Sequence, residues 1–364
     1  MTFRIKQGDN RDVLKTIEDN SIDAIVTDPP YGIDFLGKEW DANTGALETY
    51  QECLRVLKPG GHILAFSAPR TYHHLAITLE QAGFEIRDQI MWIYSSGFPK
   101  AQKINGFDGW KNGALKPAHE PIALARKPVK TSIEKNMQKW GVGALNIDPC
   151  RIERPGEENR FPSNVIGEIP DYQKYFYCPK VSRAERHIGF DTTNIPTNPD
   201  GMWDEGVQFQ EKKQGLITSD EMLAKMGGHW LDGNGNQVGS ERDGSKMLWL
   251  PHTGAIFTHG LKHEYEKWCK ANNVALGNVG NNHPTVKPVE LMKYLIKLIT
   301  PPGGTVLDPF SGSGSTGMAA VELGCDYTGI ELDPSYVEIA QTRIQAWTER
   351  HTTNNFKDLF SATE

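Results

Sequence analysis

Apolar positions in the first hundred residues follow two spacings that alternate along the chain. Runs of strand length lie at residues 4–7, 22–26, 62–66 and 84–94, and stripes with helical spacing lie at 10–17, 47–57 and 72–82. Strands that alternate with helices in this way pair in parallel. The pattern therefore predicts an α/β fold with a doubly wound, mostly parallel sheet.

The same alternation returns near the carboxyl end. The elements predicted there are a helix at 288–300 that begins with Pro288, strands at 305–307 and 326–330, and a helix at 318–323. Residues 1–130 and 283–364 are therefore predicted to form one discontinuous domain.

The interrupting stretch, from residue 95 to about 282, is rich in Gly, Pro, Asn and charge and shows no sustained period. Residues 131–282 are predicted to be an inserted region. Residues 97–130 carry seven Lys and Arg against two acidic residues, with aromatic side chains interleaved. Nucleic-acid surfaces combine basic charge with stacking rings, so we expect nucleic-acid contact here, although such lysines are often only solvated. The candidate DNA-binding residues are Lys100, Lys103, Lys116 and Lys127.

Composition limits the class of protein. The charged fraction of 23% and hydrophobic fraction of 38% are those of a soluble globular enzyme. No apolar run approaches the length of a membrane span, and the amino terminus lacks the apolar core of a signal peptide. The five cysteines are scattered, which argues against zinc and for a reduced, cytoplasmic setting. The net charge of −7 means that any DNA surface must be local.

The segment Asp28-Pro29-Pro30-Tyr31 follows the apolar run at 22–26. Neither proline can donate to a strand ladder, and both restrict the backbone, so the strand must end in a stiff turn. This turn presents a carboxylate, a carbonyl and an aromatic ring at the edge of a parallel sheet where ligands bind. The two oxygen groups suit an NH2 donor, and Tyr31 can stack on a planar heterocycle. The alternative is an ordinary turn after a strand.

A second notable segment, Asp308 to Gly317, lies between a predicted strand and a predicted helix. It contains G-x-G-x-x-G at Gly312, Gly314 and Gly317, in the context where this motif indicates nucleotide binding. Glu331 follows the next predicted strand, where a carboxylate can accept both hydroxyls of a ribose.

Two other nucleotide-binding classes explain only part of this pattern. A nucleotide triphosphatase would carry the lysine of a phosphate-binding loop, which this segment lacks. A nicotinamide dehydrogenase would have its glycine motif near the start of its domain, and it gives no reason for Asp-Pro-Pro-Tyr. A site for one nucleoside without a pyrophosphate needs the glycines only for close backbone approach.

Together, Asp-Pro-Pro-Tyr, Asp-Pro-Phe-Ser-Gly-Ser-Gly and the terminal Gly-Ile-Glu-Leu-Asp resemble the S-adenosylmethionine-dependent amino-methyltransferases of DNA. The catalytic motif comes first and the cofactor motif comes last, after His-Pro-Thr-Val-Lys-Pro at 283–288. This order is similar to the beta group of the family, a circular permutation of the Rossmann-like, cofactor-first arrangement. The resemblance covers roughly residues 3–130 and 283–345. The stretch at 116–128 is also similar to phage-type members.

The resemblance implies a role for each matching residue. Asp28 and the Pro29 carbonyl would hold the target NH2, Pro30 would stiffen the turn, and Tyr31 would stack on a base rotated out of the duplex. The implied cofactor-binding residues are Asp9, Thr285, Lys287, Asp308, Phe310, Ser311, Gly312, Gly314, Thr316 and Glu331. For Asp9, a helix cap is an equally good explanation.

The resemblance also implies the reaction, which is methyl transfer from S-adenosylmethionine to an exocyclic amine in double-stranded DNA. Adenine N6 is favoured because Asp leans to adenine at the first motif position. Cytosine N4 is the runner-up, and a non-catalytic DNA-binding subunit is the third alternative. The inserted region would recognise the target, no membrane partner is expected, and a homodimer and a cognate restriction enzyme are left open.

Overall fold

The computed structural model describes residues 1–33, 44–94, 101–113, 115, 117–153, 158–167, 188, 219–231, 237–238, 247–250, 254–257, 267–269, 271, 281, 283 and 285–361. The chain divides into two compact units, residues 1–188 with 285–364 and residues 189–284. The candidate DNA-binding residues Lys100 and Lys116 lie outside the described residues.

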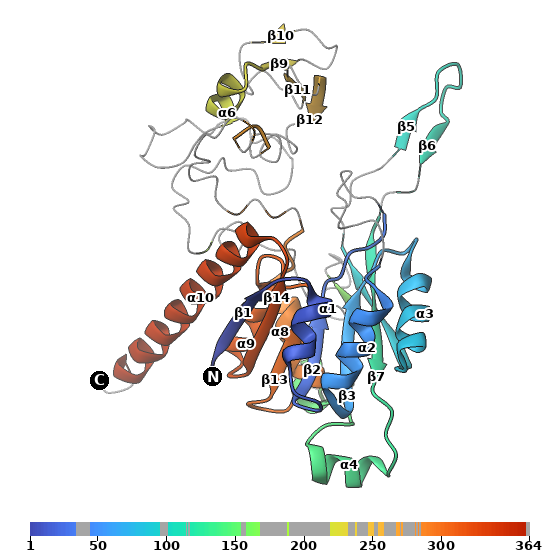
Figure 1. Cartoon of the computed structure of the whole chain (residues 1–364), viewed down its shortest axis with the longest axis vertical. Helices are drawn as coiled ribbons and strands as arrows, with labels where there is room; N and C mark the ends of the chain where they lie inside the picture. Colours follow the sequence, from blue (N-terminus) through green and yellow to red (C-terminus); the bar gives the residue numbers. More distant parts are fainter. Residues whose placement is uncertain are drawn as a thin grey trace. The chain divides into compact units, whose positions relative to one another are not determined.

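The first unit is built on an eight-stranded sheet with the order β1-β14-β13-β2-β3-β7-β4-β8 (Figure 1). The strands are β1 (Phe3–Gln7), β2 (Ile22–Thr27), β3 (Leu57–Phe66), β4 (Glu85–Ile93), β7 (His119–Arg126), β8 (Val165–Gly167), β13 (Thr305–Asp308) and β14 (Asp326–Glu331). Strand β7 runs antiparallel to both neighbours, and the other pairings are parallel. The predicted Rossmann-like α/β fold is confirmed.

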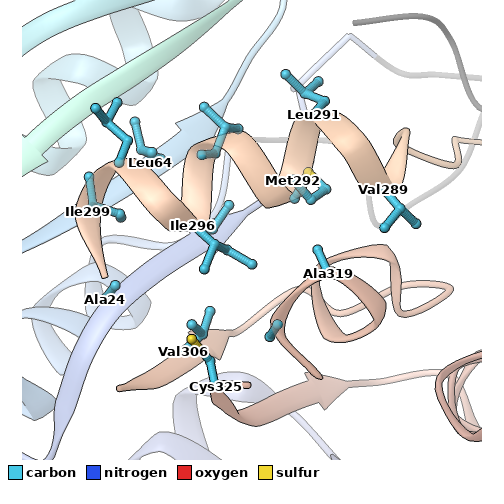
Figure 2. Packing of buried hydrophobic residues seen from close by; sticks show 14 of the residues in the cluster. Ala24, Leu64, Val289, Leu291, Met292, Ile296, Ile299, Val306, Ala319 and Cys325 are labelled. Atoms are coloured by element: carbon cyan, nitrogen blue, oxygen red, sulfur yellow. The ribbon is translucent and has the colours of Figure 1, made fainter. Parts of the chain in front are cut away.

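Helices cover both faces of this sheet. They are α1 (Asn10–Val13), α2 (Leu47–Val56), α3 (Tyr72–Ala82), α8 (Val289–Ile299), α9 (Ser315–Glu322) and α10 (Pro334–Ser361), with a 3-10 turn η1 (Leu14–Thr16). One apolar core lies between the sheet and α8, α9 and α10, and the other between the sheet and η1, α2 and α3. Figure 2 shows α8 directing Met292 and Ile296 towards Val306 of β13 and Ala319 of α9. The apolar stripe of α8 is therefore core, as its spacing predicts.

Three element boundaries differ from those predicted. Strand β3 begins at Leu57, directly after α2, so it includes residues 58–61, which separate the predicted helix from the predicted strand. Gly60 takes a φ of 80° there, and its N–H donates to the Lys127 carbonyl, so the ladder continues through this irregular stretch. Pro288 is the N-cap of α8 rather than its first residue. Helix α9 begins three residues earlier than predicted, at Ser315.

Neither helix α10 nor strand β7 was predicted from the sequence, and β7 is the one that completes the middle of the sheet. The buried part of β7, residues 121–125, is only five residues long and begins with Pro121. So short a run has no measurable period, and a proline argues against a central strand. The observed β7 nevertheless lies between β3 and β4, and it begins at the edge where they end.

The first unit extends beyond the predicted boundary at residue 130. Helix α4 (Ile133–Trp140) is held by Asn136, whose side-chain amide donates to the Pro59 carbonyl. Strand β8 pairs in parallel with β4, and the Asn146 N–H donates to the Leu298 carbonyl. Residues 131–167 thus complete the sheet and its cover, and the second compact unit begins only at 189.

Two smaller pieces of structure lie within the interrupting stretch. Strands β5 (Ala101–Lys103) and β6 (Lys111–Gly113) form a hairpin. The second unit contains α6 (Ser219–Lys225) and a four-stranded antiparallel sheet of β9 (His229–Leu231), β10 (Gln237–Val238), β11 (Met247–Leu250) and β12 (Gly254–Phe257). Within the part of the chain that the structure describes, no helix could cross a membrane.

Candidate active site

The predicted site residues meet at one edge of the sheet. Strands β1, β14, β13 and β2 are parallel neighbours, so their carboxyl ends lie side by side. Asp28 follows β2, Asp308 ends β13 and Glu331 ends β14. The antiparallel β7 begins at this same edge and contributes Glu120.

Asp28 is the centre of a largely buried polar cluster. Its Oδ2 accepts from the Lys287 ammonium at 2.6 Å, and its Oδ1 accepts from the Tyr31 hydroxyl at 2.8 Å. Glu120 Oε2 lies 2.8 Å from the same hydroxyl and 3.4 Å from the same ammonium. The Lys287 ammonium also lies 5.0 Å from the centroid of the Phe66 ring. The stiff Pro29-Pro30 turn therefore places the predicted carboxylate and ring together, beside a lysine and a second carboxylate.

The electrostatics of this cluster follow from burial and from its charges. Burial raises the pKa of Asp28 above its ordinary value; Lys287 opposes this rise and Glu120 adds to it. Burial works to lower the pKa of Lys287, but the charges of Asp28 and Glu120 raise it overall. Burial and both carboxylates hold the pKa of Tyr31 well above its usual range, so the phenol stays protonated. Lys287 is thus a charged partner of Asp28, whereas the sequence placed it with the cofactor.

Asp308 holds the segment from Asp308 to Gly317, called the glycine-rich loop from here on, to the sheet. Its Oδ1 accepts from the Thr27 hydroxyl at 2.6 Å and from the Phe310 N–H at 3.0 Å, and its Oδ2 accepts from the Thr316 hydroxyl at 2.7 Å. The side chain is buried, which raises its pKa to about 6 against the effect of these donors. Asp308 and Thr316, both predicted to bind cofactor, therefore bind each other and set the shape of the loop.

Helix α10 supports the glycine-rich loop from behind. A Cβ on Gly317 would come within 2.3 Å of Ile344 Cδ1, and one on Gly314 within 3.0 Å of Ala340 Cβ. The fully buried Arg343 donates from Nη1 to the Ser313 carbonyl and hydroxyl. Two of the motif glycines thus serve close packing of the loop against α10. Arg343 was missed because its partners lie 30 residues away.

Glu331 lies against the turn of the glycine-rich loop. Its Oε2 accepts from the Gly312 N–H at 2.8 Å and its Oε1 from the Asp333 N–H at 2.9 Å. The Ser311 N–H donates to the Ile330 carbonyl, and the Ser311 hydroxyl lies 2.9 Å from the Tyr327 hydroxyl. Burial raises the pKa of Glu331, and these backbone donors oppose the rise. The carboxylate is therefore fixed in position at the edge of the sheet.

The first turn of the chain meets the same loop. Asp9 caps α1, since its Oδ1 accepts from the Arg11 N–H, and it also forms an ion pair with Arg11. The alternative role as a cap is therefore confirmed. Asn10, which the sequence did not single out, donates to the Pro309 carbonyl at 3.1 Å. Thr285 is half-buried, next to the buried Val286.

The predicted DNA-binding lysines have different surroundings. Lys103 is exposed on β5, in a hairpin that also exposes Phe107 and Trp110, with 61% and 72% of their surfaces accessible. Lys127 instead donates to the Asn20 side chain and to the carbonyls of Arg55 and Leu57. Lys127 lies at the end of β7, opposite the Asp28 edge. Its ammonium is therefore structural, and we leave it out of the DNA surface.

The comparison with protein families agrees with this geometry. Residues 22–342 match the N6_N4_Mtase family model, described as DNA methylase. The chain belongs to this family. The protein is thus an N6/N4-type DNA amino-methyltransferase, and the cofactor of the family is S-adenosylmethionine.

Individual relatives share low sequence identity with this methyltransferase over most of its length. Type II methyltransferase M.BglI of Bacillus subtilis is 26% identical over 94% of this chain and 85% of its own. DNA adenine methyltransferase YhdJ of Escherichia coli is 24% identical over 93% and 82%. The solved structure of the cytosine-N4-specific PvuII DNA methyltransferase aligns with 96% of this chain and 93% of that chain, at 15% identity and a TM-score of 0.45.

The residues at the edge of the sheet fit S-adenosylmethionine. Gly312 has a φ of 51°, and because glycine has no Cβ its backbone can approach a ligand closely. A carboxylate offers about four acceptor positions, and the two backbone donors leave acceptors on Glu331 for ribose hydroxyls. Within the described part of the chain, no cluster of three or more His, Cys, Asp or Glu could hold a metal.

Proposed function

We propose that this methyltransferase acts on the N6 amine of adenine in double-stranded DNA. The observation that carries the proposal is the Asp28 carboxylate, held at the carboxyl end of β2 by Lys287 and Tyr31. An acidic first motif residue favours adenine by resemblance to the family, and the name of the YhdJ relative supports it. The amine of cytosine N4 could make the same two hydrogen bonds, so it is the outcome that the experiments must exclude.

Asp28 and the Pro29 carbonyl would each accept one hydrogen of the target amine. These two hydrogen bonds orient the nitrogen lone pair away from the base ring. Alignment of the reacting groups can lower the activation barrier of a displacement by at most about 7–11 kcal/mol. When bound, S-adenosylmethionine would supply an electrophilic methyl group. The amine nitrogen would form the new N–C bond as the C–S bond breaks, S-adenosylhomocysteine would leave, and the nitrogen would give up one of its two protons. The target base must leave the duplex to reach Asp28, at a cost of a few kcal/mol.

The cofactor would lie against the glycine-rich loop and Glu331. Gly312 allows close backbone approach, Gly314 lets the loop pack against α10, and Phe310 is half-buried in the same loop. Asp308, Thr316 and Ser311 would act indirectly, through the shape of the loop.

Sequencing that detects modified bases tests the proposal in cells. DNA from a host without methyltransferases of its own, expressing this protein, should carry N6-methyladenine at a defined sequence. Cells expressing Asp28→Ala are the matched control and should carry far less of it. Modified cytosine at that site would contradict the adenine assignment.

The second compact unit, residues 189–284, is the proposed target-recognition region. It has its own antiparallel sheet and a buried group of Met222, Leu223 and Trp230. A separate unit can determine which sequence is methylated while the residues of the methyl transfer stay in the first unit.

Replacing Glu331 with alanine should weaken binding of S-adenosylmethionine by about 1–3 kcal/mol, the scale of losing hydrogen bonds to a charged group. Calorimetric titration of the purified protein measures this directly. Asp326→Ala, at the opposite end of β14, is the control and should bind as the wild type does. Binding of NADH in place of S-adenosylmethionine would contradict the cofactor site.

Neutralising the exposed hairpin lysines, in Lys103→Ala and Lys111→Ala, should lower DNA affinity on all sequences alike. Each lost phosphate contact should also reduce the slope of log affinity against log salt by about one. Fluorescence anisotropy across a salt series measures both. Lys135→Ala on α4 is the control and should change neither. An unchanged slope in the hairpin variants would place the DNA surface elsewhere.

A further inference from the structure

Glu120 is the part of the Asp28 cluster to which no role has yet been assigned. It enters the site from β7, and its Oε2 lies 2.8 Å from the Tyr31 hydroxyl. The Lys287 ammonium lies 3.4 Å from the same oxygen. A hydrogen bond to Glu120 is also among the causes that raise the pKa of Tyr94, after burial and the Glu120 charge.

Asp28 and Glu120 share the same two donors. Lys287 and Tyr31 each contact both carboxylates, with Lys287 closer to Asp28, at 2.6 Å, than to Glu120, at 3.4 Å. A phenol has one hydrogen, so Tyr31 can donate fully to only one of the two carboxylates at a time. At any moment, therefore, one of the two carboxylates does not hold the Tyr31 hydrogen and is able to accept it.

Asp28 cannot serve the target amine fully while it is also the main partner of both donors. Releasing it without a substitute would leave a buried ammonium unpaired, which is strongly unfavourable. The side chain of Lys287 is only 8% exposed, so water would not compensate. Glu120 already lies within reach and can receive both donors without any change of backbone.

We propose that Glu120 is a positioning residue, which takes over the Lys287 ammonium and the Tyr31 hydroxyl when Asp28 turns to the target amine. This inference rests on the proposed function, because it assigns Asp28 to the amine. Glu120 touches neither the amine nor the methyl group, and it acts through Lys287 and Tyr31.

The exchange has a consequence for pH dependence. The titratable and charged groups facing Asp28 are Lys287, Tyr31 and Glu120 directly, with Asp308 and Tyr94 behind them. Asp28 must be ionised to accept the amine, so the rate falls as pH drops through its pKa. Glu120 raises that pKa, and a neutral side chain at 120 should therefore move the acid limb of the pH–rate profile to lower pH.

The test compares Glu120→Gln with wild type in single-turnover methyl transfer to DNA, measured from pH 5 to pH 9. Without the second negative charge, Lys287 should stay with Asp28. The rate at neutral pH should then drop about 10-fold or more, the scale of a misaligned catalytic group. The acid limb should move down by about half a unit to one unit. Cofactor affinity, measured by calorimetry, should remain that of the wild type.

Two further variants separate positioning from structure. Glu120→Asp keeps the charge but shortens the side chain, so it should restore the wild-type acid limb and part of the rate. It also carries the test if Glu120→Gln does not fold. Glu85→Gln is the control, because Glu85 bonds Arg126 at 2.7 Å on the same strand pair, at the opposite edge of the sheet. It should change neither the rate nor the limb.

A wild-type rate and an unmoved acid limb in Glu120→Gln would overturn the inference. So would equal losses of rate and cofactor affinity with no shift in the limb, which would indicate a structural role. Failure of the proposed function has a different signature, since wild-type protein would then place the methyl group on cytosine. The ratio of the Glu120→Gln rate to the wild-type rate, and the position of the acid limb, can be measured whichever base is methylated.

Discussion

Replacing Asp28 with alanine is expected to lower the single-turnover rate of methyl transfer by about 10²-fold or more, the scale of losing one preorganised polar group. The residue follows β2 and contributes no ladder contact, so the fold should survive. Lys287 would keep Glu120 as its partner, so no buried ammonium is stranded. Rapid-quench measurement with labelled S-adenosylmethionine gives the rate directly.

Asp28→Asn is the matched variant for this prediction. It preserves the shape of the side chain but offers one acceptor oxygen and an NH2 group, so it should retain at most part of the activity. Both variants should bind S-adenosylmethionine, which calorimetry can verify. A near wild-type rate in Asp28→Ala would remove Asp28 from the mechanism.

Replacing Lys287 with methionine is expected to move the acid limb of the pH–rate profile upwards by about one unit or more. Lys287 lowers the pKa of Asp28, so its removal leaves burial and Glu120 to raise that pKa unopposed. Asp28 would then be protonated, and unable to accept the amine, at a pH where the wild type is active. The rate at pH 6 should therefore fall more than the rate at pH 8. This shift is opposite in sign to that predicted for Glu120→Gln.

Lys293→Met is the control for the lysine prediction. Lys293 forms ion pairs with Glu290 and Glu322, away from Asp28, and its loss should leave the acid limb in place. An unmoved limb in Lys287→Met would show that the ion pair does not control Asp28. A loss of cofactor affinity alone would instead support the role that the sequence suggested for this lysine.

Much of the first unit was predictable from sequence because its signals are local. The strand and turn at Asp28 depend on adjacent apolar residues and prolines, and the cofactor loop depends on glycines within six positions of one another. Periodicity over ten residues or more was enough for α2, α3 and α8. These features place both halves of the site at one edge of the sheet.

The missed features depend on contacts between distant residues. Glu120 lies 92 residues from Asp28 in the chain, and β7 was too short to show a period. The pairing of Lys287 with Asp28 joins residues 259 positions apart. The structural role of Lys127 likewise depends on three acceptors that only folding brings to it. Residue type and spacing carry no signal for such pairings.

The identity of the methylated base tests the central claim most directly. Wild-type protein would transfer labelled methyl groups to unmethylated double-stranded DNA in a single turnover, and the product would be hydrolysed and separated into nucleosides. With wild-type protein, we expect the label in N6-methyl-2′-deoxyadenosine. With Asp28→Ala, we expect no label above background at the same time point. Label in the N4-methylated cytosine nucleoside, or equal labelling by the two proteins, would contradict this account.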